Sequence, residues 1–336
     1  MYIYAMYVPP FNICAEIINL IADISAQIER YAIRLEREDS LRLRRANRIK
    51  TIQSSLAIEG NTLSEEDVRD VMDGKTVVAP IRQVQEVRNA IRAYDLFSSL
   101  DPFKEGDLLR AHGVLMESLV DDAGKYRTGG VGVFGETGMV HLAPPPERVA
   151  GLMGDLFEWL GGSRDHLLIR SCVFHYEFEF IHPFVDGNGR TGRLWQSLIL
   201  SRLHPLFAHL PVENMVYANQ QAYYDAIAQS TKEGQSGPFI VFMLSEILRS
   251  LKLHQGERIN HQAVDNKVSN KVDNKISNTQ LVVLSLLKKD PYLTIAQIAE
   301  KSSLSTATVK KALAALKVAG RISRVGSNKS GYWVVE

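Results

Sequence analysis

The apolar residues of about the first 250 positions recur with the period of an α-helix, and this pattern is interrupted only once. The first apolar stripe runs from Ile17 to Ile28, where the isoleucines share one helical face. The interruption covers residues 124–149, which are rich in glycine and contain three consecutive prolines. It predicts a β-hairpin with strands near Val131–Phe134 and Met139–Leu142. The expected fold class is therefore mainly α, an all-helical core with one β-hairpin.

The C-terminal part of the chain is organised differently. Two helical patterns are separated by a short turn, and Ser305 or Thr306 is the expected N-cap of the second helix. A small hairpin follows, which completes the outline of a winged helix with a β-wing. The length of 336 residues suits two domains. We expect an N-terminal helical region at 1–80, a core at 81–255, a linker at 256–278 and a winged-helix domain at 279–336.

The expected linker contains a four-residue repeat. The repeat places four apolar residues on one narrow helical stripe, namely Val264, Val268, Val272 and Ile276. Asn and Lys are too frequent between them for a stable isolated helix. The segment is either a marginal helix that pairs with another copy or a loosely ordered spacer.

The formal net charge of +1 is unevenly distributed. Residues 279–336 contain nine Lys and Arg against three Asp and Glu, a net charge of +6, and the remainder contains 30 against 35, a net charge of −5. Basic residues of the C-terminal segment that suit contact with phosphate groups are Lys310, Lys311, Lys317 and Lys329. Few base-reading side chains begin the second helix, so DNA and a protein both remain possible partners of this segment.

The cysteines and the N-terminus indicate the compartment. Cys14 and Cys172 are too few for a disulfide framework, and no metal-binding spacing of Cys and His occurs. The apolar N-terminus lacks a basic region and is broken by Pro9 and Pro10, so we expect no signal peptide. No apolar run is long enough to span a membrane. These features predict a cytoplasmic protein.

The segment FIHPFVDGNGRTGR, which ends at Arg193, combines a permissive backbone with fixed cations. Gly187 and Gly189 let the main-chain N–H groups around Asn188 converge at the start of a helix, where unpaired donors and the helix dipole attract an anion. Arg190 and Arg193 are three residues apart, so they share a helical face and both reach the anion. Two arginines exceed the need of a single carboxylate, and we expect a polyphosphate.

Two further residues of this segment indicate a reaction. Asp186 would be repelled by the anion unless a cation lay between them, and Mg²⁺ held by one carboxylate and by phosphate oxygens supplies that cation. His182 lies at the end of the preceding helix, where an imidazole takes a proton from an incoming hydroxyl group. The sequence therefore predicts attack of a hydroxyl group on a bound polyphosphate.

The residues from His182 to Arg193 match the motif HPFx(D/E)GNGRxxR of the Fic family at every defined position. The chain resembles this family over roughly residues 10–250, and the expected hairpin stands where the family has a flap that positions the substrate. The resemblance implies transfer of AMP from ATP to a Ser, Thr or Tyr hydroxyl of a protein, called AMPylation. A kinase-like branch of the fold has a lysine at the position of Gly189, so the glycine favours nucleotidyl transfer.

The resemblance also implies roles for single residues. His182 is the general base, and Asp186 is the Mg²⁺ ligand. The other motif residues implied to bind the nucleotide are Gly187, Asn188 and Gly189 at the α-phosphate, Arg190 and Arg193 at the β- and γ-phosphates, and Thr191 and Gly192 between them. The flap residues implied to align the target by strand addition are Val131, Gly132, Val133 and Phe134. Tyr223 and Tyr224 resemble tyrosines on the adenine side of relatives, although either could be a core residue.

The sequence SSLAIEGN has the pattern of a helix end, with Gly60 as the residue that follows the helix. An acid at Glu59, in the last turn, is opposed by the helix dipole unless a cation pairs with it. In Fic proteins the motif (S/T)xxxE(G/N) forms an inhibitory helix, and Ser55, Glu59 and Gly60 fit this motif. The resemblance implies that Glu59 pairs with Arg193 and keeps the γ-phosphate from docking productively.

Two functional classes remain. One is a self-restrained AMP transferase that uses ATP and Mg²⁺ to modify a hydroxyl-bearing protein and itself. The other is a DNA-binding transcriptional regulator whose core senses nucleotide. The intact His182 favours the enzyme, because a sensor needs no base. The sequence also leaves open the reverse reaction that removes AMP, a donor other than ATP, and a homodimer whose contacts tune Glu59.

Overall fold

The computed structural model describes residues 7–35, 40–135, 138–264, 283–284, 286–287, 293–302, 306–318, 322–325 and 332–335. The chain divides into two compact units, residues 1–261 and 262–336. Each unit has a hydrophobic core of its own. No described helix has the length and the apolar content that are needed to cross a membrane.

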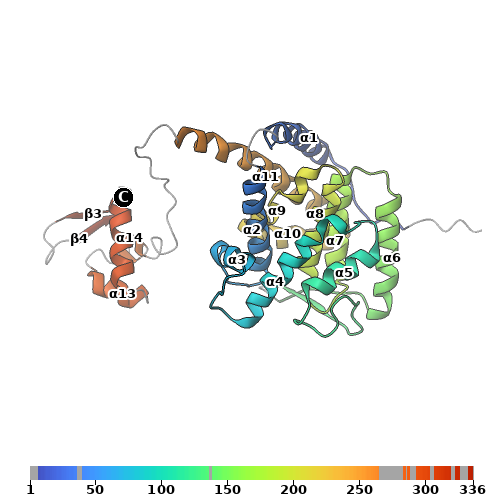
Figure 1. Cartoon of the computed structure of the whole chain (residues 1–336), viewed down its shortest axis with the longest axis horizontal. Coiled ribbons are helices and arrows are strands. Elements are labelled where there is room, and N and C mark those ends of the chain that lie inside the picture. The colour runs from blue at the N-terminus through green and yellow to red at the C-terminus, as the bar shows by residue number, and fades with distance from the viewer. Residues whose placement is uncertain are drawn as a thin grey trace, which may run out of the picture. The chain divides into compact units, whose positions relative to one another are not determined.

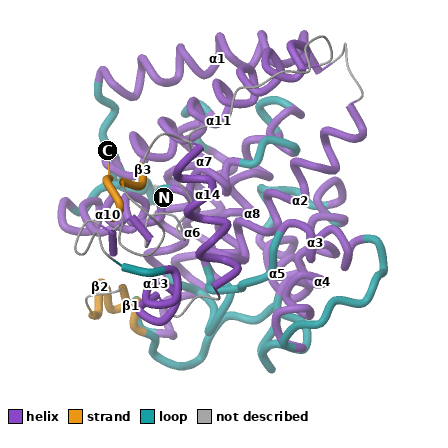
Figure 2. Tube along the Cα trace, turned by 90° about the vertical axis from the view of Figure 1, so that its left-hand side faces the viewer, coloured by secondary structure: helices purple, strands orange, loops and turns teal. Residues whose placement is uncertain are grey.

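Helices of the first unit surround a central helical pair (Figure 1). The helices are α1 (Ala15–Leu35), α2 (Ser40–Ile58), α3 (Glu65–Met72), α4 (Ile81–Asp95), α5 (Glu105–Leu115), α6 (Pro146–Gly162), α7 (Leu167–Ile181), α8 (Asn188–Ser201), α9 (Val212–Ala218), α10 (Gln220–Glu233) and α11 (Gly237–Val264). Two short 3₁₀ helices are η1 (Phe97–Ser99) and η2 (Pro205–Ala208). Both views show α1 beside α11 at one edge of the unit (Figure 1, Figure 2).

The central pair is α7 and α8, which pack along each other. Most residues of α7 and nearly all of α8 are buried, which is the pattern of helices enclosed on all sides. The large aromatic side chains Phe174, Phe178 and Trp195 are fully buried and contribute most to this core. The motif from His182 to Gly187 is the connection between these two helices, so the core fixes both ends of the loop.

A two-stranded antiparallel sheet is inserted between α5 and α6. Its strands are β1 (Gly132–Gly135) and β2 (Gly138–Leu142), with Gly132 opposite Leu142 and Gly135 opposite Gly138. The register shifts between Val133 and Phe134, as in a β-bulge. At its base, the N–H of Ala143 donates to the carbonyl of Val131 at 3.3 Å. Residues 136 and 137 of the expected turn lie outside the described residues.

The second unit has the order helix, helix, hairpin. Its elements are α13 (Ile295–Ser302), α14 (Thr306–Val318), β3 (Ile322–Val325) and β4 (Tyr332–Val335), and the two strands pair antiparallel. Val309, Leu316 and Trp333 are among the residues that form its core. Ser305, Lys329 and the tip of the expected wing lie outside the described residues.

α11 is longer than the sequence pattern predicted. The helix continues to Val264, so the first part of the segment expected as a linker at 256–278 is helical. The other members of the four-residue repeat, Val268, Val272 and Ile276, lie outside the described residues.

Candidate active site

His182 lies at the C-cap of α7 with φ 50° and ψ 62°, in the left-handed region. A residue other than glycine rarely adopts this conformation, which costs on the order of 1–3 kcal/mol. Its N–H donates to the carbonyl of Phe178 at 2.9 Å. Its Nδ1 lies 3.3 Å from the carbonyl of Glu179, and because a carbonyl only accepts, Nδ1 carries the hydrogen. The lone pair of the neutral ring is therefore on Nε2, the atom that a general base needs.

The loop after His182 is closed by the side chain of Asn188. Its Oδ1 accepts from the N–H of Phe184 and its Nδ2 donates to the carbonyl of Phe184, both at 2.9 Å. The Phe184 ring is fully buried and stacks on the His112 ring with 3.6 Å between centroids. Both polar atoms of the Asn188 side chain are thus used within the loop. The main-chain N–H of Asn188, on which the sequence-based prediction of an anion site rests, is the group left to bind a phosphate.

His112 of α5 supports the next residues of the loop. Its Nδ1 accepts from the N–H of Gly124 at 2.8 Å, so its Nε2 donates to the carbonyl of Asp186 at 3.0 Å. Burial lowers the pKa of His112 to about 4, which keeps this ring neutral. Gly187 has φ 83°, and a Cβ there would lie 2.5 Å from Sδ of Met116. The left-handed φ is what favours glycine at position 187, because the flexible end of the Met116 side chain can move away from a Cβ.

The N-terminus of α8 follows this loop directly and carries Arg190 in its first turn. The first N–H groups of a helix have no partner within the helix and attract anions. Arg190 lies 3.0 Å from Asp186 and 3.7 Å from Glu86, and Arg82 lies 3.3 Å from the second oxygen of Asp186. Buried Nε of Arg190 and Oγ1 of Thr191 have no hydrogen-bond partner among the described residues. These orphaned donors suit a ligand with many acceptor oxygens.

Asp186 is the candidate ligand for a divalent cation. Among the described residues, no group of three His, Cys, Asp or Glu side chains could hold a metal ion. Mg²⁺ does not need such a group, because it is usually bound by one or two carboxylates together with phosphate oxygens and water. The single carboxylate beside an anion site therefore fits Mg²⁺ that arrives with a nucleotide.

Arg193 faces the C-terminus of α2 and has a different environment from Arg190. Its side chain is 3% exposed. Its NH2 donates to Glu59 at 2.7 Å and to the carbonyl of Ser55 at 2.9 Å, and its Nε donates to the hydroxyl of Ser55 at 3.1 Å. Burial opposes the positive charge and is the largest single effect, but Glu59, Tyr223 and Glu179 together outweigh it, and the pKa of Arg193 is raised. The two arginines on one helical face are thus engaged by different helices.

Glu59 follows the last residue of α2 and is held there by main-chain bonds. Asn61 donates to the carbonyl of Leu56 at 3.1 Å and Gly60 donates to the carbonyl of Ala57 at 3.0 Å, the two bonds of a Schellman cap. A Cβ placed on Gly189 would lie 2.4 Å from Oε1 of Glu59. The carboxylate therefore lies against the start of α8, where a bound anion would be attracted.

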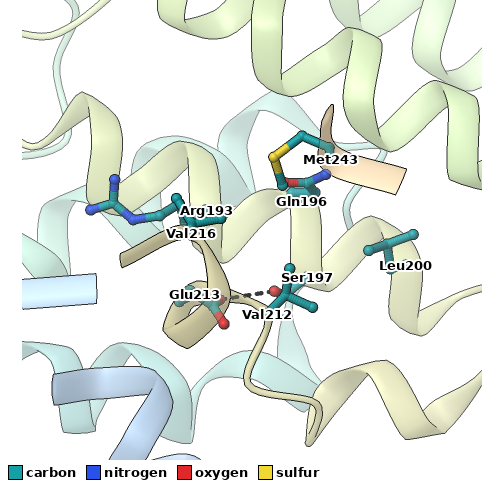
Figure 3. Close-up of a pocket in the computed structure, with 8 residues that line it drawn as sticks. All are labelled: Arg193, Gln196, Ser197, Leu200, Val212, Glu213, Val216 and Met243. Atoms are coloured by element: carbon teal, nitrogen blue, oxygen red, sulfur yellow. Dashed lines mark hydrogen bonds between the residues drawn. The ribbon is translucent and has the colours of Figure 1, made fainter. Parts of the chain in front are cut away.

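A small pocket lies behind Arg193 (Figure 3). Its volume is about 10 Å³, close to the least that holds one water molecule. It is lined by Arg193, Gln196, Ser197, Leu200, Val212, Glu213, Val216 and Met243. The hydroxyl of Ser197 donates to Oε1 of Glu213 at 3.0 Å, whereas Oε2 of Glu213 has no partner among the described residues. Burial raises the pKa of Glu213 to about 7.

The two tyrosines of α10 have different positions. Tyr223 is buried, and its hydroxyl lies 3.1 Å from Nε2 of His175. Nδ1 of His175 lies 2.6 Å from Oε1 of Gln196, so the ring is satisfied on both sides and Tyr223 is a core residue. Tyr224 is 42% exposed. A contact with a base is therefore open to Tyr224 but not to the hydroxyl of Tyr223.

The structure adds supporting residues that the sequence analysis missed. They are Arg82 and Glu86 on α4, His112 on α5, Arg127 before β1, Glu179 on α7 and Glu213 on α9. Burial raises the pKa of Glu179 to about 8, against the pull of Arg193. No motif marks these residues. His112, Glu179 and Glu213 have one sequence signal, a polar or charged residue among mainly apolar neighbours, as in HYEFEF around Glu179.

Comparisons with known proteins agree with this geometry. A model of the Fic/DOC family matches residues 100–200, and a model described as winged helix-turn-helix DNA-binding matches residues 276–323. The crystal structure of a Fic family protein from Desulfovibrio desulfuricans G20 is 40% identical, with a TM-score of 0.73, and the match covers 98% of each chain.

Curated relatives share a part of the chain. Protein adenylyltransferase Fic of Culex quinquefasciatus is 30% identical over 219 residues, which are 61% of this chain and 41% of the relative. Protein adenylyltransferase Fic of Nematostella vectensis is 31% identical over 206 residues, 57% of this chain and 45% of the relative. The match thus spans less than half the length of these relatives.

Proposed function

This chain belongs to the Fic family, and we propose that it is a protein adenylyltransferase, which moves AMP from ATP to a hydroxyl group of a protein, itself included. One observation carries the proposal. The imidazole of His182 and the N-terminus of α8, with Arg190 and Arg193 in its first two turns, are joined by one rigid loop. A base next to an anion site is what attack on a bound phosphate requires.

In this reaction the hydroxyl oxygen forms a bond to the α-phosphorus of ATP. The bond between that phosphorus and the oxygen leading to the β-phosphate breaks, and pyrophosphate leaves. His182 takes the hydroxyl proton on Nε2, because Nδ1 carries the hydrogen that faces Glu179. The N–H groups at the start of α8 and the two arginines stabilise the negative charge that develops on the phosphate oxygens.

Asp186 would hold Mg²⁺, which supplies neutralisation of the phosphate charge when it is bound. Arg190 and Arg82 contact the two oxygens of Asp186. We expect both arginines to turn toward phosphate oxygens or solvent when ATP is present.

The proposal includes self-inhibition. Glu59 contacts Arg193 and lies against Gly189, so its carboxylate competes with the γ-phosphate for the same donors. We propose that displacement of Glu59 is required for productive binding of ATP. The main chain of Val131–Phe134 would align the target by strand addition. The cytoplasm suits the free thiols of Cys14 and Cys172, and a homodimer stays a prediction.

The experiment uses wild type, Glu59→Gly and the double variant Glu59→Gly with His182→Ala. We expect label from ATP labelled at the α-phosphate to enter the protein in Glu59→Gly, weakly in wild type and not in the double variant. Calorimetry should give the double variant the same ATP affinity as Glu59→Gly. If Glu59→Gly binds ATP but takes up no label, the proposed transferase activity is wrong. If label enters only from UTP, the donor is UTP and not ATP.

A second candidate function concerns residues 262–336. The match to a DNA-binding winged helix-turn-helix model supports it, and Lys310 and Lys317 on α14 are exposed. We propose that this unit binds a DNA duplex through α14. Binding of the full chain to random duplex, measured by mobility shift at increasing salt, tests this function separately from AMP transfer.

A further inference from the structure

Arg127 lies directly before the β1–β2 hairpin and is 2% exposed. Among the described residues its side chain makes four hydrogen bonds, and each of them ends on a main-chain carbonyl. Nε donates to His182 at 2.8 Å, NH1 to Gly129 at 2.9 Å, and NH2 to Pro144 at 2.6 Å and to Ile181 at 3.3 Å. A guanidinium that binds only carbonyl oxygens fixes backbone directions, because its planar fork of donors is rigid.

The four carbonyls belong to two structures that the fold must bring together. Gly129 and Pro144 are the two ends of the hairpin segment, before β1 and after β2. Ile181 is the last residue of α7, and His182 is its C-cap. One side chain therefore ties both ends of the hairpin to the helix end that carries the imidazole.

The main chain of Arg127 strengthens the same connection. Its N–H donates to the carbonyl of Pro183 at 2.9 Å. Arg127 thus holds the carbonyls of both His182 and Pro183. It does so next to the unfavourable φ of 50° at His182. The positive charge also lies at the C-terminus of α7, where the helix dipole favours a cation. These contacts offset the backbone strain at His182.

We propose that Arg127 is a positioning residue that holds the β1–β2 hairpin in a fixed register with His182. The inference rests on the proposed function, in which the main chain of β1 aligns a target hydroxyl with Nε2 of His182. Without Arg127 the nucleotide would still bind, because none of the four carbonyls belongs to the residues from Asp186 to Arg193. The distance between the target hydroxyl and Nε2 of His182 would no longer be fixed.

The experiment introduces Arg127→Met or Arg127→Lys into the Glu59→Gly protein. Methionine keeps an apolar stem, and lysine keeps the charge but lacks the fork. The matched control is Arg170→Met, because Arg170 also donates to a main-chain carbonyl, that of Leu160, but near the other end of α7. The readouts are AMP transfer to protein, ATP affinity by calorimetry, and amide hydrogen exchange of residues 129–144.

Both Arg127 variants should lose at least tenfold in AMP transfer, with ATP affinity changed less than twofold and faster exchange confined to the hairpin segment. Arg170→Met should keep transfer per folded molecule. Proportional loss of ATP affinity and transfer, or unchanged transfer, would overturn the inference.

The exchange measurement separates this inference from the proposed function. If the Glu59→Gly parent binds ATP but transfers no AMP, the proposed function fails. In that case hairpin exchange that is unchanged in Arg127→Lys still overturns the positioning role. If Arg127→Met does not fold, the lysine variant gives the same comparison.

Discussion

Oε1 of Glu59 lies 2.7 Å from NH2 of Arg193, although the two residues are 134 positions apart in the chain. Arg193 is almost completely buried, whereas the Glu59 side chain is about one third exposed. The acid is therefore the partner that can leave, and the arginine is fixed. This asymmetry is what a displaceable internal inhibitor needs.

Glu59→Gln should raise AMP transfer at least tenfold and at the same time lower stability. Glutamine keeps the shape of the side chain but leaves the buried Arg193 without its counterion, which costs about 1–3 kcal/mol. Labelled ATP measures the first effect and thermal unfolding the second. ATP should raise the Tm of the variant more than that of wild type.

The matched control for this prediction is Glu66→Gln, at an exposed position on α3. It should leave transfer unchanged and lower Tm only slightly, because Glu66 lies in the first turn of α3, where the helix dipole favours an acid. A Glu59→Gln protein that is more stable than wild type, or that transfers no faster, would contradict the inhibitory role of Glu59.

Glu213→Gln should flatten the dependence of stability on pH. Burial raises the pKa of Glu213 to about 7, so the folded chain binds this proton more tightly than the unfolded chain. The contribution to stability is complete below the ordinary carboxyl pKa and is lost as pH rises through 7. The variant should therefore gain about 3 kcal/mol relative to wild type between pH 4 and pH 8.

Urea unfolding at pH 4, 6 and 8 measures this difference. Glu158→Gln, at an exposed position on α6, is the control and should leave the pH dependence unchanged. If the free energy of unfolding depends on pH in the same way for wild type and Glu213→Gln, Glu213 of the folded protein is already ionised at pH 6.

Gly187→Ala should destabilise the protein by about 1–3 kcal/mol. Alanine is strained at φ 83°, and its Cβ would lie 2.5 Å from Sδ of Met116. ATP affinity should fall as well, because the N-terminus of α8 begins at the next residue. Urea unfolding measures the loss of stability, and calorimetry measures the loss of ATP affinity.

The control for Gly187→Ala is Gly151→Ala in α6, where a Cβ would meet no atom within 4 Å. That change should stabilise the helix by about 0.5–1 kcal/mol. If Gly187→Ala is tolerated as well as Gly151→Ala, the loop does not require the backbone conformation that it has.

Replacing Lys310 and Lys317 of α14 by alanine should weaken DNA binding and lower its salt dependence. Each lost phosphate contact should reduce the slope of log K against log salt by about 0.9. Mobility shifts of random duplex between low and high salt measure the slope. Lys301→Ala in the last turn of α13 is the control, and absence of any shift at low salt would point to a protein partner.

The sequence by itself determined the local features of this protein. The helical periods predicted the mainly α fold, and the motif from His182 to Arg193 predicted a loop that ends in a helix N-terminus. These features depend on neighbouring residues, which interact in the same way wherever the segment lies. The resemblance to the Fic family then supplied the pairing of Glu59 with Arg193, which spacing alone does not contain.

Only the tertiary structure decided which side chains support that loop. Arg127 reaches four carbonyls, His112 fixes the carbonyl of Asp186, and Asn188 uses its amide inside the loop. Tyr223 proved to be a core residue bonded to His175. Such contacts join segments far apart in the chain, and they form because buried polar groups must find partners. The local sequence does not indicate the hydrogen-bond partner of a buried polar group, because the packing of whole helices determines which groups come together.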